Sequence, residues 1–224
     1  MPIQINRPVI SWIACRQLMW LLIISAVATT GCTRLMTLGA LLVYGTELPP
    51  DFKELQGKRV AVAVATPSGI QNDASSAILS RQLSALMAMN VKKISMVDMQ
   101  EVDQVAKDFP MGSFDMVKLG ERLDAQYLVA VELSDLQLHD GPTLYKGRCK
   151  CIVSVYKIGD GEPLVFTKDH SNFTAPASGI SKMAMDEAKF QGIYLGLLAK
   201  FIAMSFHPHE RGADIAIDAA FHSL

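Results

Sequence analysis

Few residues of this chain combine the type and the spacing that enzyme chemistry requires. Serine, histidine and aspartate all occur, but no nucleophile-elbow pattern surrounds a serine, and no glycine-rich dinucleotide fingerprint is present. Residues 66–69 follow an apolar run and precede a helical pattern, yet they lack the lysine and glycine spacing of a phosphate-binding loop. We therefore expect a protein that is not an enzyme and that binds no cofactor.

The side chains that could bind a metal ion are not held by the predicted structure at a defined distance from further ligands. His207, His209 and Glu210 are metal ligands by type, but they flank a proline in a tail without a clear structural pattern. Cys149 and Cys151 point to the same face of a predicted strand, where a disulfide between them would be strained. We expect no metal site, and we interpret the two cysteines as small buried apolar side chains.

A basic triplet, Lys146, Arg148 and Lys150, lies at every second position of the same predicted strand. This triplet could bind an anionic partner, such as a phospholipid surface or an acidic protein. Alternate positions on a strand share one face, so the triplet also fits a solvated sheet face, with Asp135 paired to it across a hairpin. We favour the solvated face and retain the triplet as a possible partner-binding site.

The N-terminus has the layout of a secretory signal. Two arginines precede the apolar run 18–28, which is shorter than the roughly 20 residues that a membrane-spanning helix needs. Residues 29–32 resemble a bacterial lipobox, in which the cysteine becomes the lipidated first residue of the mature chain. Thr29 departs from that pattern, where leucine is usual. We predict a signal peptide over residues 1–31 and attachment to the lipid bilayer through acylated Cys32, with palmitate among its acyl chains.

A second apolar run, residues 35–44, follows Arg34. One interpretation is a single uncleaved membrane helix through both runs, although a charged Arg34 inside it would be costly. The other is a cleaved signal, with the second run on the membrane or packed on the folded domain. Residues 47–51 contain Pro-Pro and predict a linker. Residues 32–56 are therefore assigned as a membrane-proximal segment and linker.

The remaining sequence predicts one α/β (α+β) domain over residues 57–206, followed by a tail at 207–224. The formal net charge of the 224 residues is -1, which gives no reason to expect binding to nucleic acid. The helices should pack on a mixed sheet of about five strands, in the order strand-helix-strand-helix-helix-strand-strand-strand-helix. The predicted elements are strands at 60–65, 91–97, 127–139, 144–158 and 164–167, and helices that start at Asn72, Asp73 or Ser75, at Asp98, at Ser113 and at Ser181.

Two local patterns add detail to this sheet. Residues 127–131 are all apolar, which favours a strand covered on both faces in the middle of the sheet, whereas the alternation after Leu133 predicts one face in contact with water. Residues 159–161, Gly-Asp-Gly, predict a hairpin turn in which at least one glycine has a positive φ angle. We expect Gly161→Val to be destabilising there, and residues 173–176 to end the sheet.

Three segments resemble the periplasmic α/β domain shared by the N-terminal domain of TolB, the curli-export lipoprotein CsgG and the peptidoglycan-synthase activator LpoB. They are the opening strand at 60–65 before a long helix, the helix-to-strand step at 119–129, and the hairpin at 155–166. The resemblance covers roughly residues 57–206. It implies a non-enzymatic protein that acts by protein contact in the cell envelope. The pore-forming member has membrane-inserting hairpins, and we find no comparable amphipathic insert.

These patterns together favour a membrane-anchored bacterial envelope lipoprotein, with its domain on the periplasmic side. We expect it to bind an envelope protein or a cell-wall component without catalysis. The alternative is an oligomeric subunit of an export or secretion assembly, built from copies of the same domain.

Overall fold

The computed structural model describes residues 47–109, 115–159 and 161–212, and the folded unit begins at Leu48. The predicted signal peptide, Cys32 and the second apolar run lie outside the described residues. Among the helices in the described part, none is both long and apolar enough to cross a membrane.

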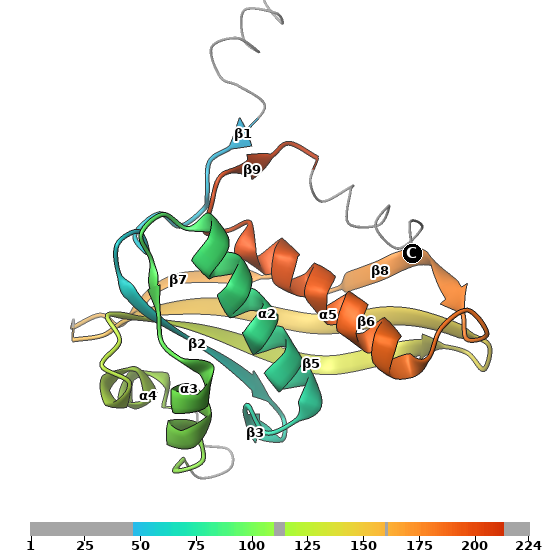
Figure 1. Cartoon of the computed structure of the whole chain (residues 1–224), viewed down its shortest axis with the longest axis horizontal. Coiled ribbons are helices and arrows are strands. Elements are labelled where there is room, and N and C mark those ends of the chain that lie inside the picture. The colour runs from blue at the N-terminus through green and yellow to red at the C-terminus, as the bar shows by residue number, and fades with distance from the viewer. Residues whose placement is uncertain (1–46, 110–114, 160, 213–224) are drawn as a thin grey trace, which may run out of the picture. The chain divides into compact units, whose positions relative to one another are not determined.

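A mixed sheet of seven strands forms the centre of this unit (Figure 1). The central strand β5 pairs with β2 in parallel and with β6 in antiparallel orientation. Strands β7 and β8 both pair with the outer side of β6, and two short strands, β3 and β4, flank β2. The strands are β2 (Arg59–Thr66), β3 (Gly69–Ile70), β4 (Ser95–Met96), β5 (Tyr127–Asp140), β6 (Leu144–Lys157), β7 (Leu164–Asp169) and β8 (Phe173–Ser181).

Helices cover both faces of one half of this sheet. Figure 1 shows α2 (Ala74–Asn90) and α5 (Glu187–Ala203) side by side on one face. The shorter α3 (Met99–Ala106) and α4 (Met116–Arg122) contribute to a second core on the other face. Two further short strands, β1 (Glu47–Leu48) and β9 (His209–Glu210), form a separate two-stranded sheet. The predicted fold class and the approximate order of elements are confirmed.

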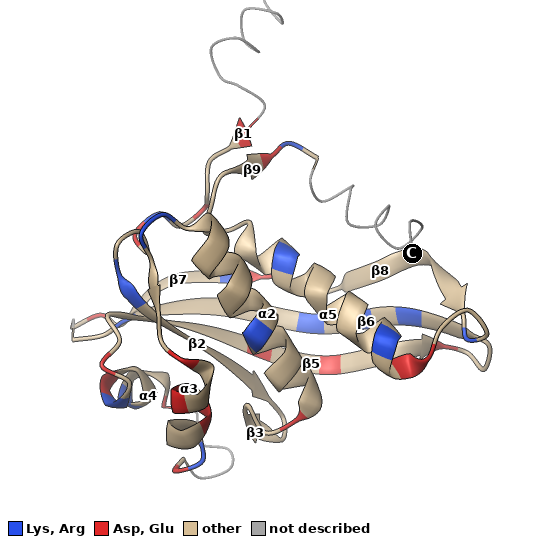
Figure 2. Ribbon diagram, viewed as in Figure 1, with Lys and Arg blue, Asp and Glu red and all other residues tan. Residues whose placement is uncertain are grey.

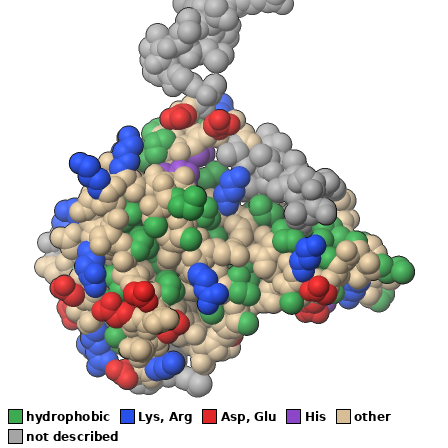
Figure 3. All heavy atoms as spheres, viewed as in Figure 1, with side chains coloured by type: hydrophobic (Ala, Val, Ile, Leu, Met, Phe, Trp, Pro, Cys, Tyr) green, Lys and Arg blue, Asp and Glu red, His purple; other side chains and the backbone are tan. Residues whose placement is uncertain are grey.

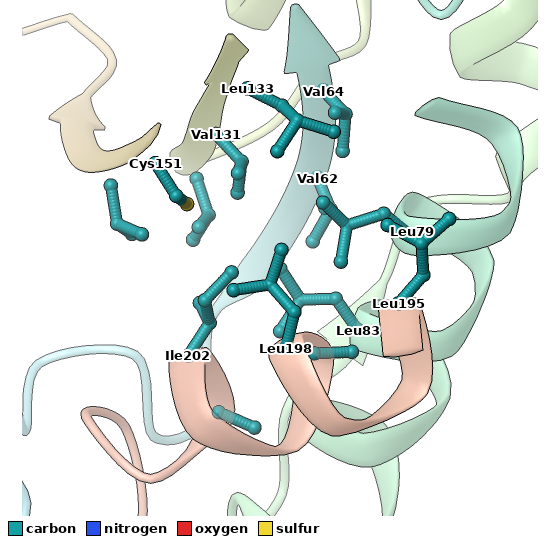
Figure 4. Packing of buried hydrophobic residues seen from close by; sticks show 14 of the residues in the cluster. Val62, Val64, Leu79, Leu83, Val131, Leu133, Cys151, Leu195, Leu198 and Ile202 are labelled. Carbon is teal, nitrogen blue, oxygen red and sulfur yellow. The ribbon is translucent and has the colours of Figure 1, made fainter. Parts of the chain in front are cut away.

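The composition of β2 explains why it lies inside the sheet. Its three valines belong to the core under α2 and α5, and its alanines belong to the core under α3 and α4. Figure 4 shows Val62 and Val64 of β2 in the same apolar cluster as Leu83 of α2 and Leu198 of α5. Strand β5 repeats this two-sided burial from Tyr127 to Val131, which confirms the predicted central strand. The segment before β2 also adds two core residues, Phe52 and Leu55.

Two helix starts are where the sequence predicts them. At α2 the backbone N–H of Ser76 donates to Asp73 Oδ1 at 2.7 Å, and the N–H of Asp73 donates to Ser76 Oγ at 3.2 Å. This reciprocal pair is a capping box, which satisfies N–H groups that the first helical turn cannot. At α3 the N–H of Gln100 donates to Asp98 Oδ1 at 2.7 Å. Because each cap satisfies an otherwise unpaired donor, it fixes where the helix begins.

Three predicted elements are corrected by the structure. The strand predicted at 91–97 is limited to β4, because Lys93 has a φ of 57° and the chain turns before Ser95. Helix α4 is capped by Asp115, and Ser113 lies outside the described residues. The sheet continues through β8 where we expected it to end, so the last helix starts at Glu187 with Asp186 as its cap, well after Ser181.

The glycine turn between β6 and β7 gives a prediction with a built-in control. Gly159 has a φ of +89°, whereas Gly161 has no positive φ, so the expectation placed on Gly161 was wrong and Gly159 has the required conformation. A Cβ at either position would meet no atom within 4 Å, so only backbone strain distinguishes them. We expect Gly159→Val to lower the free energy of unfolding by about 1–2 kcal/mol, with a much smaller effect for Gly161→Val. Urea denaturation of both variants measures this difference, and equal losses would contradict it.

Candidate docking surface

The sheet has one face that the described helices leave uncovered. Beyond Val131, Glu132 and Gln137 are exposed and Ser134 is half-buried, while Leu133 and Leu138 remain in the core under α5. Three cross-strand pairs define this open face: Glu132 with Ile152, Ser134 with Lys150, and Gln137 with Arg148. The alternation predicted after Leu133 is confirmed, and it produces a solvated sheet surface.

Ion pairs hold most of the basic triplet in place on this surface. Lys150 Nζ lies 2.6 Å from Asp135 Oδ2, as predicted, and Arg148 Nη2 lies 3.4 Å from Asp140 Oδ2. The hydrogen bond from Lys150 to the Asp135 carboxylate raises the pKa of that ammonium group. Lys146 is half-buried. Figure 2 shows basic positions along β6 and acidic positions on β5, so the triplet is part of a mixed-charge surface.

A backbone irregularity positions one of these acids. The pairing of β5 with β6 shifts register between Ser134 and Gln137, and Asp135 has a φ of 52°. An extra residue in one strand of a pair re-aims the side chains around it. The shift therefore accompanies the placement of the Asp135 carboxylate within reach of Lys150, beside the open face.

A hollow of about 260 Å³ adjoins the open face where β2 ends. Ile152, which is 36% exposed, lies beside charged neighbours at this hollow. An apolar centre with a polar rim is the usual composition of a protein–protein contact. The lining residues come from the end of β2, from β5, from β6 and from the β7–β8 connection: Ala65, Thr66, Glu132, Ser134, Lys150 and Ser171.

The opposite side of the unit offers a less distinctive surface. Figure 3 shows lysines, arginines and acidic side chains scattered among apolar ones over α2 and α5. Met89 on α2 is 80% exposed, but single exposed apolar residues are common on protein surfaces. This helical side serves as a reference surface for the tests below.

The basic triplet should contribute little to stability. The ion-paired side chains of Arg148 and Lys150 are 47% and 59% exposed, and exposed ion pairs contribute about 0–1 kcal/mol each. We therefore expect the triple change Lys146→Gln, Arg148→Gln and Lys150→Gln to shift the melting temperature by only a few degrees. Circular dichroism during heating measures the shift. Loss of cooperative melting would show that the triplet is a structural part of the hairpin.

The other residues considered as sites are either part of the core or not grouped with further ligands. Cys149 and Cys151 are buried free thiols, as predicted, and burial raises the pKa of both. Figure 4 shows Cys151 within the apolar core, so it is not placed as a reactive thiolate. Within the described ranges, no three His, Cys, Asp or Glu side chains are grouped closely enough to hold a metal ion.

Comparison with known proteins finds similarity among solved structures. No protein-family model matches the chain, and no curated protein matches it in sequence. The C-terminal domain of LpoB from Salmonella enterica is 13% identical, with 51% of this chain and 81% of that chain covered at a TM-score of 0.36. A minor lipoprotein from Acinetobacter baumannii is 16% identical, with 65% and 89% covered at a TM-score of 0.33. PelC from Paraburkholderia phytofirmans, solved as a dodecamer, is 8% identical, with 72% and 95% covered at a TM-score of 0.39.

Proposed function

We propose that this protein is a non-catalytic lipoprotein of the bacterial envelope, anchored through Cys32, which docks on another envelope protein through the open face. The observation that carries this proposal is the open face itself. It combines a half-covered sheet, an exposed Ile152 and an adjoining hollow within one surface. The lipobox-like residues 29–32 and the resemblance to periplasmic lipoprotein domains supply the cellular setting.

The charges of the open face favour a protein as its partner over a phospholipid surface. Glu132, Asp135 and Asp140 on β5 match the basic triplet on β6 one for one, so this part of the hairpin has no excess positive charge. Anionic lipid attracts clusters of unmatched basic residues. A protein surface with one apolar side chain for the hollow, surrounded by charges of both signs, complements this arrangement better.

An oligomeric subunit of an export assembly is the second candidate. A face with balanced charges can also pair with a second copy of itself, because each acid can meet a base of the partner copy. Size-exclusion chromatography with light scattering on the chain from Glu47 onward distinguishes the two candidates. We expect a monomer, and a stable ring would favour the export candidate.

The anchor gives a prediction that does not depend on the open face. Cys32→Ala should abolish incorporation of labelled palmitate and leave the precursor unprocessed by the lipoprotein signal peptidase. Both effects are expected because the sulfur of the Cys32 side chain is the atom that accepts the lipid. Labelling of cells that express the native chain and the variant measures both effects. Absence of palmitate from the native protein would show that the departure at Thr29 prevents lipidation.

The docking role is tested by two matched substitutions. Ile152→Glu places a carboxylate at the apolar centre of the open face, and Met89→Glu places the same charge on the exposed side of α2. In affinity capture from detergent-solubilised envelopes, we expect a protein that the native chain and Met89→Glu retain and that Ile152→Glu loses. Retention by all three baits would exclude the open face as the contact.

A further inference from the structure

A second hollow lies at the connection between β7 and β8, and it has a different chemistry from the open face. Its volume is about 510 Å³, within the range of sites that bind small ligands. Residues of the connection and of β8 form most of its lining, and Phe201 of α5 closes one side. The hollow therefore depends on the end of α5 and on β8, the strand that the sequence did not predict.

Aromatic rings supply the apolar part of this lining. The ring centroids of Phe173 and Phe201 are 5.3 Å apart, and the imidazole of His170 meets Phe201 edge to face at 5.0 Å. Both phenylalanines are half-buried. Half-buried rings around a hollow offer flat apolar surface to a ligand, with contact energy that depends on ring geometry.

His170 lines the same hollow, and one of its ring nitrogens is a buried polar atom without a partner among the described residues. The residue is only 6% exposed, and its Nε2 has no hydrogen-bond partner in the part of the chain that the structure describes. Burial lowers the pKa of His170 to about 4, so the ring is neutral at neutral pH. A buried polar atom without a partner is costly. Because Nε2 is itself buried, a ligand hydroxyl recovers that cost only when the imidazole turns toward the hollow.

The two charged residues that line the hollow are already engaged. Lys168 Nζ lies 2.7 Å from Asp51 Oδ2, and Asp169 Oδ1 accepts a hydrogen bond from the backbone N–H of Ser171 at 2.6 Å. Recognition of an ionic ligand would have to compete with these contacts. The other polar side chains of the lining, among them Ser171, Asn172 and Thr174, are neutral groups that can both donate and accept.

We propose that this hollow binds a neutral sugar ring, whose C–H face stacks on Phe201 and Phe173 and whose hydroxyls bond with Asn172 and Thr174, and with His170 when its ring turns toward the hollow. A sugar combines an apolar face with neutral hydroxyls, and the wall offers partners for both. A peptide is less well matched, because the turn at residues 170–172 interrupts the sheet edge between β7 and β8, so an added strand would lack a continuous edge. The two hollows share only Ser171 of the β7–β8 connection. Because Ile152 lines one hollow and Phe201 the other, either proposal can fail alone.

Isothermal titration calorimetry on the full chain, in a detergent without sugar headgroups, tests this proposal. The probes are N-acetylglucosamine, its β-1,4-linked tetramer, and tetra-alanine. We expect saturable binding of the tetramer and none of tetra-alanine. Tighter binding of the tetramer than of the monomer would identify a glycan chain as the source, and equal affinity would identify a free sugar.

Two variants and one control locate the binding. Phe201→Ala removes a stacking surface and should weaken the binding of the saccharide tetramer about tenfold. Asn172 has a φ of 76°, which glycine adopts freely, so Asn172→Gly deletes the amide without backbone strain and should weaken binding roughly threefold. Met183→Ala, at a residue that is 98% exposed and does not line the hollow, should leave affinity unchanged. If Phe201→Ala fails to fold, the affinity of Asn172→Gly for the tetramer decides whether the hollow is the binding site.

Three results would overturn the proposal. The first is the absence of saturable heat with either saccharide. The second is unchanged affinity in the folded Phe201→Ala and Asn172→Gly variants, and the third is preferential binding of tetra-alanine.

Discussion

Val129→Asp is expected to unfold the domain. Val129 is 0% exposed and lies on β5 between Val62 of β2 and Val155 of β6, so its neighbours on both strands are also buried. A carboxylate there has no cation in the surrounding apolar core to pair with. Burial of an unpaired charge costs several kcal/mol, comparable to the whole ~5–15 kcal/mol of a typical domain. Far-ultraviolet circular dichroism should show no cooperative melting transition.

A change on the same strand provides the control for this result. Gln137→Asp introduces the same carboxylate on β5, but at an exposed position of the open face. It should melt close to the native chain, since surface substitutions usually change stability by less than about 0.5 kcal/mol. A cooperative transition near the native temperature for Val129→Asp would contradict the central position of β5.

Gly147→Ala is expected to be the most destabilising of the glycine substitutions considered. A Cβ at Gly147 would overlap the ring carbons Cδ2 and Cε2 of Tyr194, which is fully buried. The ring cannot move away easily, because its hydroxyl donates to the carbonyl oxygen of Phe173 at 3.0 Å and Phe190 stacks beside it. Overpacking of this kind costs roughly 1–3 kcal/mol. Urea denaturation measures the loss.

Gly192 is the matched control for this substitution. It lies in the interior of α5, two residues before Tyr194, and a Cβ there would meet no atom within 4 Å. Alanine favours a helix over glycine by about 1 kcal/mol, so Gly192→Ala should stabilise the domain slightly. Equal stability of Gly147→Ala and the native chain would show that the Tyr194 ring can shift without cost.

The local sequence was sufficient to predict the centre of the fold. The apolar run from Tyr127 to Val131 identified the buried strand β5, because a strand covered on both faces is apolar at successive positions. Asp98 fixed the start of α3, because it supplies the hydrogen-bond acceptor that the first turn lacks. Period-two spacing placed the basic triplet on one face and predicted that Asp135 pairs with it; the structure shows that Lys150 is the member that does so.

The missed elements depend on contacts between distant segments. We expected residues 173–176, which finish with Pro176, to end the sheet, but β8 lies at the outer side of β6, where an edge strand tolerates proline. Its pairing with β6 also displaces the start of the last helix to Glu187. Alternation after Leu133 predicted a solvated face, but the hollow beside Ile152 also needs the end of β2 and the β7–β8 connection. The sequence around His170 gave no indication that this residue is buried, because its burial depends on contact with Phe201 of α5.

Photo-crosslinking in intact cells tests the docking role of the open face most directly. A benzophenone amino acid is placed at Ile152 in one variant and at Met89, on the helical side, in the other. Such a group reacts only with atoms in contact with it, so we predict a defined adduct with another envelope protein from position 152 and no adduct from position 89. An adduct of twice the chain's own mass from position 152 would instead support the oligomeric subunit. No adduct from position 152 in the anchored protein, or equal adducts from both positions, would contradict the open face as the docking surface.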